Sequence, residues 1–250
     1  MEIPDFMKIF ASGRRMEVLE ALLKGRTKKE IKASVPVSTF AFTVDYLKKV
    51  KFAMERDGEV VLTDSGRAYL MVFEHFIRSI TTLQKIFRAF PDHIIFFPDD
   101  FYIRLYEIST FELVASEPSD VLKPHRVFFG YLRESENIEG VTPLLFPDYP
   151  EMLYELVTFQ NPSISLVVSE DIHTTILGYD QNAFENVEIY VIDHAPKIAL
   201  TVSDVFLSIG FFYKSGNYDF TRDLIATSPE ALKFGRDIVA YYRQQSRKIV

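Results

Sequence analysis

The chain contains no cysteine, which excludes disulfides, thiol catalysis and cysteine-bound zinc and favours a reducing compartment. Its five histidines are scattered without an H-x-x-x-H pair, so we expect no metal centre. No apolar run approaches the roughly 20 residues that cross a bilayer, and charges interrupt residues 1–15 where a signal peptide would lie. We therefore expect a soluble, cytoplasmic protein without cofactor, metal or membrane contact.

Motifs for nucleotide binding and serine hydrolysis are also missing. The ten glycines form neither G-x-G-x-x-G, nor G-x-x-x-x-G-K-[ST], nor G-x-S-x-G. The nearest approach to an enzyme motif is His194 with Lys197, which is similar to the phospholipase D motif. That motif spaces the two residues two apart, whereas a spacing of three on a strand turns them to opposite faces. We therefore expect that the protein is not an enzyme. Phosphodiester hydrolysis ranks third among the functions considered, after a regulator and a protein-interaction adaptor.

Charge divides the sequence near Pro91. Residues 1–91 hold 16 Lys+Arg and 11 Asp+Glu, and residues 92–250 hold 12 and 24, so net charges of +5 and −12 make up the total of −7. Charge acts within a Debye length, and a net-acidic chain can still carry a basic module. The basic end is where a phosphate backbone could dock.

Residues 1–66 have the order of elements found in a winged helix-turn-helix domain. Residues 15–24 have apolar residues at helical spacing and precede Gly25, a common helix end. Thr27 and Glu30 form a capping box for a short second helix, which Pro36 stops. Ser38 can cap a third helix, and Asp57-Gly58 favours a tight hairpin turn between two short strands that form the wing.

In a helix-turn-helix the second helix of the pair reads base edges in the major groove. Here it would be residues 38–46, with Phe40, Val44 and Leu47 facing inward. We expect the base-reading and phosphate-contacting side chains to be Lys28, Lys29, Ser38, Thr39, Phe42, Thr43, Tyr46, Lys49 and Arg56. The alternatives are a small helical domain whose lysines only form a solvated face, and a winged helix used for protein contacts.

Residues 67–91 predict a linker helix, as part of a proline-free stretch from Asp64 to Phe90. Its apolar residues alternate spacings of four and three, which is the seam of a coiled coil. The residues expected to dimerise are Phe73, Phe76, Ile80, Leu83 and Phe87. A homodimer suits a DNA reader because two-fold operators need two reading heads, although the same stripe could instead cover its own chain.

Residues 92–250 alternate strand-like and helix-like runs, which predicts an α/β domain with a mixed sheet. Strands are expected at 93–97, 111–115, 138–146, 164–169, 187–192, 198–202 and 205–213, and a turn at residues 215–217. Helices are expected at 101–108, 121–133, 149–159, 170–178 and 229–247.

Several motifs of this acidic half occur together, among them residues 164–170 (ISLVVSE), 187–192 (VEIYVI), 197–204 (KIALTVSD), 206–212 (FLSIGFF) and 216–219 (GNYD). With these motifs the chain resembles archaeal winged-helix transcription regulators of the methanogenesis-regulator type, whose DNA-binding half is similar to the arsenic-repressor class. The resemblance implies a dimeric transcription factor with a C-terminal effector domain. In this family the last helix usually carries Trp before its glycine, where this chain has Phe234.

The combined interpretation is a regulator that binds double-stranded DNA, with a C-terminal half that senses a small molecule and shifts operator affinity. Candidate ligand-binding residues are the polar groups near the late strands, namely Asp193, His194, Lys197, Asp204 and Tyr218. The alternative from another class is an adaptor in which the acidic half recruits a protein partner.

Overall fold

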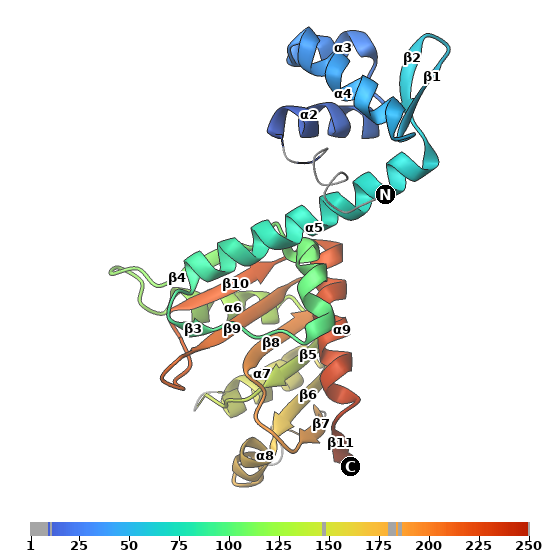
Figure 1. Ribbon diagram of the computed structural model, residues 1–250. Helices are drawn as coiled ribbons and strands as arrows, with labels where there is room; N and C mark the ends of the chain where they lie inside the picture. Colours follow the sequence, from blue (N-terminus) through green and yellow to red (C-terminus); the bar gives the residue numbers. More distant parts are fainter. Residues whose placement is uncertain (1–9, 11, 147–148, 180–183, 185–186, 250) are drawn as a thin grey trace. The chain divides into compact units, whose positions relative to one another are not determined.

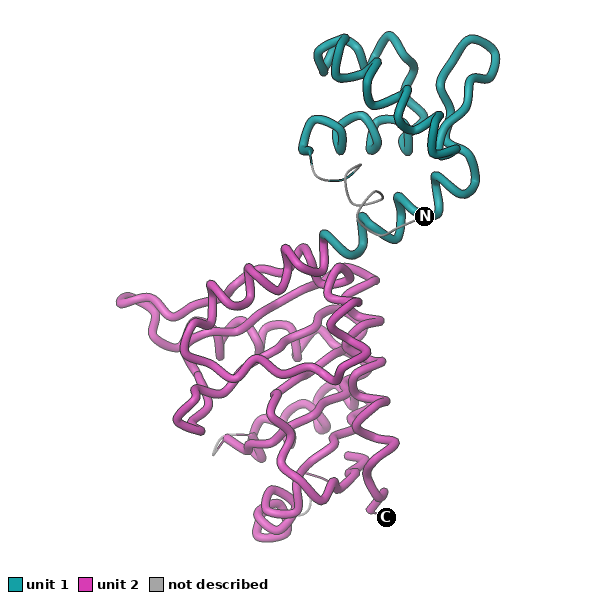
Figure 2. Tube along the Cα trace, viewed as in Figure 1, with its two compact units in different colours: residues 1–77 teal, residues 78–250 magenta. Residues whose placement is uncertain are grey.

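The computed structural model describes residues 10, 12–146, 149–179, 184 and 187–249. The chain forms two compact units, Met1–Ile77 and Arg78–Val250 (Figure 2). The division falls inside one helix, α5 (Asp64–Ala89), and not at Pro91 where the charge changes sign. Each unit has its own hydrophobic core, and α5 contributes residues to both.

Among the residues that the structure describes, the N-terminal unit contains helices α2 (Gly13–Leu23), α3 (Lys28–Ser34) and α4 (Val37–Lys49) before its hairpin (Figure 1). Gly25 follows α2 with φ of +69°, a left-handed conformation that glycine adopts without steric cost. The capping box of α3 is present, because the Thr27 hydroxyl accepts from the backbone N–H of Glu30 and the Glu30 carboxylate accepts from that of Thr27.

Helix α4 begins one residue earlier than the sequence suggested, at Val37. Pro36 occupies the cap position, and no side chain caps the helix, so the expected Ser38 cap is wrong. Proline is suited to this boundary because its fixed φ of −56° here leads directly into a helix. Ser38 is therefore a first-turn residue of α4 and is exposed.

Strands β1 (Ala53–Arg56) and β2 (Glu59–Leu62) form an antiparallel hairpin. Asp57 and Gly58 both have positive φ, at +51° and +78°, as a type I′ turn requires, so the expected Asp-Gly turn is confirmed. The hydrophobic core of this unit joins α2, α3, α4, the hairpin and the start of α5 around Val18, Leu47 and Leu70.

The described strands of the C-terminal unit form a nine-stranded mixed sheet, as the sequence predicted. Along the sheet the order is β11-β7-β6-β5-β8-β9-β10-β4, and β3 pairs separately with β9. The pairs β5–β6 and β6–β7 are parallel and the others are antiparallel. The strands are β3 (His93–Ile94), β4 (Glu112–Ala115), β5 (Asn137–Thr142), β6 (Ser163–Ser169), β7 (Val187–Ile192), β8 (Ile198–Ser203), β9 (Leu207–Tyr213), β10 (Arg222–Ala226) and β11 (Arg247–Ile249).

Helices cover both faces of this sheet, because successive side chains of each strand point to opposite sides. Val141 and Val167 pack on one side with α9 (Pro229–Arg243), η1 (Asp99–Ile108) and the end of α5. Ile138 and Val168 pack on the other side with α6 (Lys123–Leu132), α7 (Tyr149–Phe159) and α8 (Glu170–Leu177). Figure 1 shows α9 along one side of the strands.

Some expected boundaries differ from the observed ones. The strand expected at 138–146 ends at Thr142, and the helix expected at 101–108 is a 3₁₀ helix. The final helix ends at Arg243, because residues 247–249 leave it to pair with β7 as the edge strand β11. Within the described ranges, every helix is too short or too polar to traverse a lipid bilayer.

Candidate functional site

Helix α4 presents an exposed face made partly of residues expected to contact DNA. Ser38 and Phe42 lie on this face, and 57% of the Phe42 side-chain surface is exposed. The Arg15 guanidinium of α2 lies 4.8 Å from the centre of the Phe42 ring, a cation–π distance. Thr39 is half-buried beside them. The N-terminal half of α4 therefore exposes a small polar and aromatic surface with a cation next to it.

The expectation that Thr43 points outward is wrong. Thr43 is 1% exposed, and its hydroxyl donates to the Thr39 carbonyl oxygen at 2.7 Å within the helix. It lies three residues after Phe40 and four before Leu47, which places it on the buried stripe of the helix. Tyr46 is half-buried and packs against the core of the unit, so it too differs from the expected exposed residue.

The four cations expected to contact phosphates, Lys28, Lys29, Lys49 and Arg56, differ in their partners, and Lys48 of α4 shares the partner of Lys28. Lys28 and Lys48 both pair with Glu55 of the hairpin, at 2.7 and 3.1 Å. Hydrogen bonds from Lys28 and then Lys48 lower the pKa of the Glu55 carboxyl to about 2, so its negative charge offsets part of the positive charge of the two lysines. The other three, Lys29, Lys49 and Arg56, are exposed on α3, α4 and β1.

Helix α5 exposes part of the apolar stripe expected to dimerise. Phe76, Ile80 and Phe87 are exposed, and Leu83 is half-buried against the core of the C-terminal unit. Phe73 is not available, because it is 7% exposed and stacks on Phe10 with ring centres 3.6 Å apart. The preceding residue, Val72, is 71% exposed and lies four residues before Phe76. Val72, and not Phe73, therefore belongs to the exposed apolar stripe of α5.

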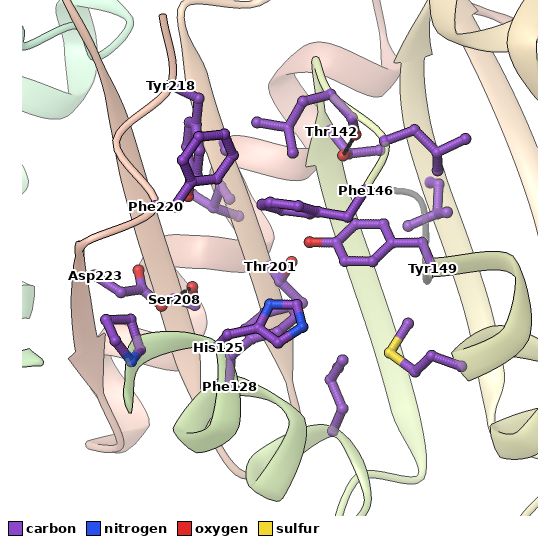
Figure 3. Close-up of a pocket in the computed structure, with 18 of the residues that line it drawn as sticks. His125, Phe128, Thr142, Phe146, Tyr149, Thr201, Ser208, Tyr218, Phe220 and Asp223 are labelled. Carbon is purple, nitrogen blue, oxygen red and sulfur yellow. Dashed lines mark hydrogen bonds between the residues drawn. The ribbon is translucent and has the colours of Figure 1, made fainter. Parts of the chain in front are cut away.

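The C-terminal unit contains a cavity of about 410 Å³ between one face of its sheet and helices α6 and α7. Its volume lies in the range of pockets that hold small organic ligands. Most of its wall is apolar and aromatic, contributed by α6, α7 and the residues after β5 (Figure 3). Apolar wall residues include Leu122, Phe128, Leu132, Leu144, Leu145, Phe146, Met152, Leu153, Leu156, Leu166, Ala199 and Phe220.

The polar part of the wall centres on Asp223 of β10. The Ser208 hydroxyl of the neighbouring strand β9 donates to Asp223 Oδ2 at 2.7 Å, and both residues are buried. Burial raises the pKa of the Asp223 carboxyl to about 7, although Ser208 and the backbone N–H groups of Leu224 and Ile209 act to lower it. Sequence reasoning missed Asp223, because an isolated Asp after Arg222 gives no local signal of burial.

Of the five expected ligand-binding residues, all of which the structure describes, Tyr218 alone lines this cavity. Its ring lies over the backbone of Gly210 in β9, where a Cβ would collide with the phenol oxygen. Glycine at 210 is thus needed to seat Tyr218 in the wall. Burial raises the pKa of the Tyr218 hydroxyl well above its usual value, and the nearby Asp223 carboxyl raises it further.

The structure does not bring the other four expected ligand residues into the cavity. Asp193, His194 and Lys197 are exposed in the loop between β7 and β8. Asp204 follows β8, and its carboxylate accepts the backbone N–H groups of Glu136 and Asn137 at 2.9 and 3.0 Å. Burial acts to raise the pKa of Asp204, but these hydrogen bonds hold it below its ordinary value, so Asp204 fixes the start of β5.

Among the described residues, no group of three His, Asp or Glu side chains is arranged to hold a metal ion. His194 and Lys197 lie on a loop and not on a strand, so the geometry of a phospholipase D motif is not reproduced there.

Comparison with known proteins identifies a family for the C-terminal unit. Residues 121–245 match the family described as the middle domain of methanogenesis regulatory protein FilR1. The chain is also 25% identical over 161 residues to the methanogenesis regulatory protein FilR1 of Methanothrix harundinacea (strain 6Ac). This match covers 61% of the chain and 36% of the relative, so the chain spans about a third of that protein's length. The expected resemblance to methanogenesis regulators is confirmed.

Two solved structures are similar at low identity. TrmBL2, described as an archaeal chromatin protein with a novel mode of DNA binding, has 10% identity and a TM-score of 0.45 over 86% of this chain and 84% of that one. Nuc, a phospholipase D family member from Salmonella typhimurium, has 13% identity and a TM-score of 0.44 over 56% of this chain and 98% of that one. Similarities at this level have no bearing on function.

Proposed function

Because the chain belongs to the FilR1 family of methanogenesis regulatory proteins, through the middle domain that residues 121–245 match, we propose that it is a DNA-binding transcriptional regulator. The observation that carries the proposal is the order of elements in the N-terminal unit, where α3, a short turn, α4 and the hairpin β1–β2 follow one another. This is the order of a winged helix-turn-helix domain, in which the second helix of the pair enters the major groove.

The exposed face of α4 is the part of this unit suited to base contacts. Ser38, Thr39 and Phe42 lie in its N-terminal half, the part of a recognition helix that approaches base edges. A hydroxyl can bond to several base edges and an aromatic ring can touch a thymine methyl group. Asp45 lies on the same face in the C-terminal half of α4, and its carboxylate repels DNA phosphates. This repulsion favours an orientation in which the N-terminal end of α4 enters the major groove.

Lys29, Lys49 and Arg56 are the cations best placed to contact phosphates. All three are exposed, and none of them forms an ion pair with another described residue. They lie on α3, α4 and the hairpin, which are the three elements that flank a groove in this type of domain. Lys28 and Lys48 contribute less, because Glu55 already pairs with both.

Dimerisation through α5 follows from its exposed apolar stripe. Val72, Phe76, Ile80, Leu83 and Phe87 repeat at spacings of four, four, three and four, which matches a coiled-coil seam. Isolated apolar residues are common on surfaces, but a contiguous stripe on one helix favours a partner of the same kind. A homodimer would supply two α4 helices for a two-fold operator.

The cavity of the C-terminal unit supports the proposed sensing role. A regulator of this family responds to a signal only if the ligand prefers one conformation over another. The cavity offers a place to bind such a ligand, and Arg222 of its wall donates a hydrogen bond to Ala89, the last residue of α5.

The test is a fluorescence-anisotropy titration of the full chain with duplex DNA from its own upstream region at several salt concentrations. We expect affinity to fall steeply with salt, and the slope to lose about 0.9 for each phosphate contact removed. The variant Lys29→Ala, Lys49→Ala and Arg56→Ala should therefore flatten the slope by about 2 to 3. A matched variant of the C-terminal unit, Lys197→Ala, Lys214→Ala and Lys233→Ala, should leave it unchanged. Equal slopes in all three proteins would contradict the proposal.

The second candidate function is a protein-interaction adaptor. It is favoured by Val37, 61% exposed, and Phe42, because two exposed apolar side chains on α4 also suit contact with a protein. The same titration separates the two candidates, since an adaptor would show no salt-dependent affinity for DNA above that of a generic acidic protein.

A further inference from the structure

The chemistry of the cavity restricts what it can bind. Its walls are apolar and aromatic over most of their area, so the body of a ligand must be a hydrocarbon or aromatic group. The acidic part of the wall is at Asp223 of β10, beside Ser208 of β9, and Tyr218 lines the wall from the segment between these strands (Figure 3). Hydroxyl and imidazole groups, such as those of Thr142, Thr201 and His125, lie elsewhere on the wall. A ligand therefore needs one polar end and one apolar body.

Asp223 determines the character of the polar end. It is 6% exposed, and its Oδ2 atom accepts the Ser208 hydroxyl. Oδ1 makes no hydrogen bond of ordinary length and angle among the described residues, although the backbone N–H groups of Leu224 and Ile209 lie near the carboxylate. A buried carboxylate oxygen without a partner costs free energy, and native structures rarely leave one unless something else fills the place. A ligand that donates a hydrogen bond to Oδ1 would remove this cost.

The cationic residues of the wall do not neutralise Asp223. Arg222 points its guanidinium to the carbonyl oxygen of Ala89, at 3.0 Å. The imidazole of His125 packs edge-on against Phe129, with ring centres 4.2 Å apart. Among the described residues, no Lys, Arg or His forms an ion pair with Asp223. Without a cationic partner, burial raises the pKa of Asp223 to about 7, and a bound cation would favour the ionised carboxylate.

We infer that the cavity binds a hydrophobic amine, with its apolar body against α6 and α7 and its ammonium group donating to Asp223 Oδ1. This inference rests on the proposed function, because it names the chemical class of the signal that the regulator would sense. An ammonium group supplies both a hydrogen-bond donor and a positive charge, whereas a neutral alcohol supplies the donor alone. The aromatic rings of Phe146, Tyr218 and Phe220 favour a cation further. A carboxylate of equal length is repelled by Asp223.

Isothermal titration calorimetry of the full chain at pH 8.0 with n-octylamine, octan-1-ol and sodium octanoate tests this directly. The three probes share one hydrocarbon chain and differ only in the polar end. We expect octylamine to bind at least tenfold more tightly than octanol, and octanoate to bind more weakly than either. Octanoate binding as tightly as octylamine would overturn the inference, and so would octanol binding equally well.

Variants separate charge recognition from folding. Asp223→Asn should weaken octylamine at least tenfold and leave octanol within about twofold, whereas Asp193→Asn, an exposed control outside the cavity, should change neither. Met152→Trp keeps Asp223 and fills the cavity, so it should abolish binding of all three probes. Unchanged octylamine affinity in folded Asp223→Asn protein, or in Met152→Trp protein, would contradict the site.

Failure of the ligand inference can be distinguished from failure of the proposed DNA-binding function. The same preparations are titrated with upstream duplex DNA, with no probe present. DNA binding without amine binding overturns only the ligand class, and amine binding without DNA binding overturns only the regulator.

Discussion

The guanidinium of Arg222 donates a hydrogen bond to the carbonyl oxygen of Ala89, the last residue of α5, at 3.0 Å. Arg222 also lines the cavity and precedes Asp223 in β10. A second connection lies close by, because His93 Nε2 is 2.9 Å from Asp219 Oδ2 and both side chains are fully buried. Arg222 therefore joins the wall of the cavity directly to the last residue of α5, and Asp219 joins the wall to β3, the strand that follows α5.

Arg222→Ala is predicted to uncouple ligand from DNA. Octylamine should still bind, within about twofold, but it should no longer change the affinity for upstream duplex DNA. In the unmodified protein we expect a change of about 5-fold or more, because couplings between sites are typically 1–3 kcal/mol. Anisotropy titrations with and without octylamine measure both values. Arg247→Ala, at an exposed arginine of the edge strand, is the control and should keep the coupling.

Asp223 predicts a pH dependence of stability with a definite sign. Its pKa in the folded protein is about 7, above the ordinary value of 3.8, so between these values the folded state binds more protons than the unfolded state. The free energy of unfolding then falls as pH rises through this window, and the contribution is lost above pH 7. Relative to the unmodified protein, Asp223→Asn should gain up to about 4 kcal/mol between pH 4 and pH 8.

Urea unfolding of the C-terminal unit, followed by circular dichroism at pH 4.5 and pH 8.0, measures this difference. Asp193→Asn controls for the general loss of one carboxylate. If Asp223→Asn shifts the free energy of unfolding equally at both pH values, the buried carboxyl does not have the raised pKa.

The two candidate caps of the N-terminal unit give contrasting predictions. Thr27 forms a complete capping box, so Thr27→Ala should lower the free energy of unfolding by about 1 kcal/mol. Ser38 lies within the first turn of α4 and makes no cap, so Ser38→Ala should change it by less than about 0.5 kcal/mol. Thermal or urea unfolding of the two variants in parallel measures both. A larger loss for Ser38→Ala than for Thr27→Ala would show that α4 begins elsewhere.

The stripe on α5 predicts the oligomeric state. Ile80→Lys with Phe87→Lys places two charges in the proposed seam and should convert a dimer to a monomer in sedimentation-velocity experiments. Gln244→Lys with Gln245→Lys adds the same charge at exposed positions after α9 and should leave the dimer intact. A monomeric unmodified protein at micromolar concentration would refute the seam.

Local features of the fold were predictable from the sequence because neighbouring residues determine them. Gly25, the Thr27–Glu30 capping box and the Asp57-Gly58 turn all have the expected conformations. Thr43 was misjudged because only Phe40, Val44 and Leu47 were assigned to the buried side of α4, whereas a helix of 3.6 residues per turn also buries the position three after Phe40. Phe73 was misjudged for a different reason, because its burial depends on Phe10, which lies more than 60 residues away in the sequence.

The cavity could not be predicted, because its wall is assembled from separate parts of the chain. Asp223 and Ser208 lie on antiparallel strands, Phe128 comes from α6 and Met152 from α7. Sequence reasoning chose Asp193, His194 and Lys197 because polar residues beside strands suggest a site, but these residues occupy an exposed loop. β10 was also missed, since its five residues follow directly on the Tyr218–Thr221 segment without a turn signal of their own.

The most direct measurement of the central claim is the affinity of Ser38→Glu with Phe42→Glu for the upstream duplex at fixed salt. Both positions are exposed on α4, so the variant should fold normally while two carboxylates face the phosphates. Thr81→Glu with Gln84→Glu on α5 makes the same change of charge elsewhere. We predict that the α4 variant loses at least 100-fold in affinity and the α5 variant less than threefold; equal losses in the two variants would contradict DNA recognition by α4.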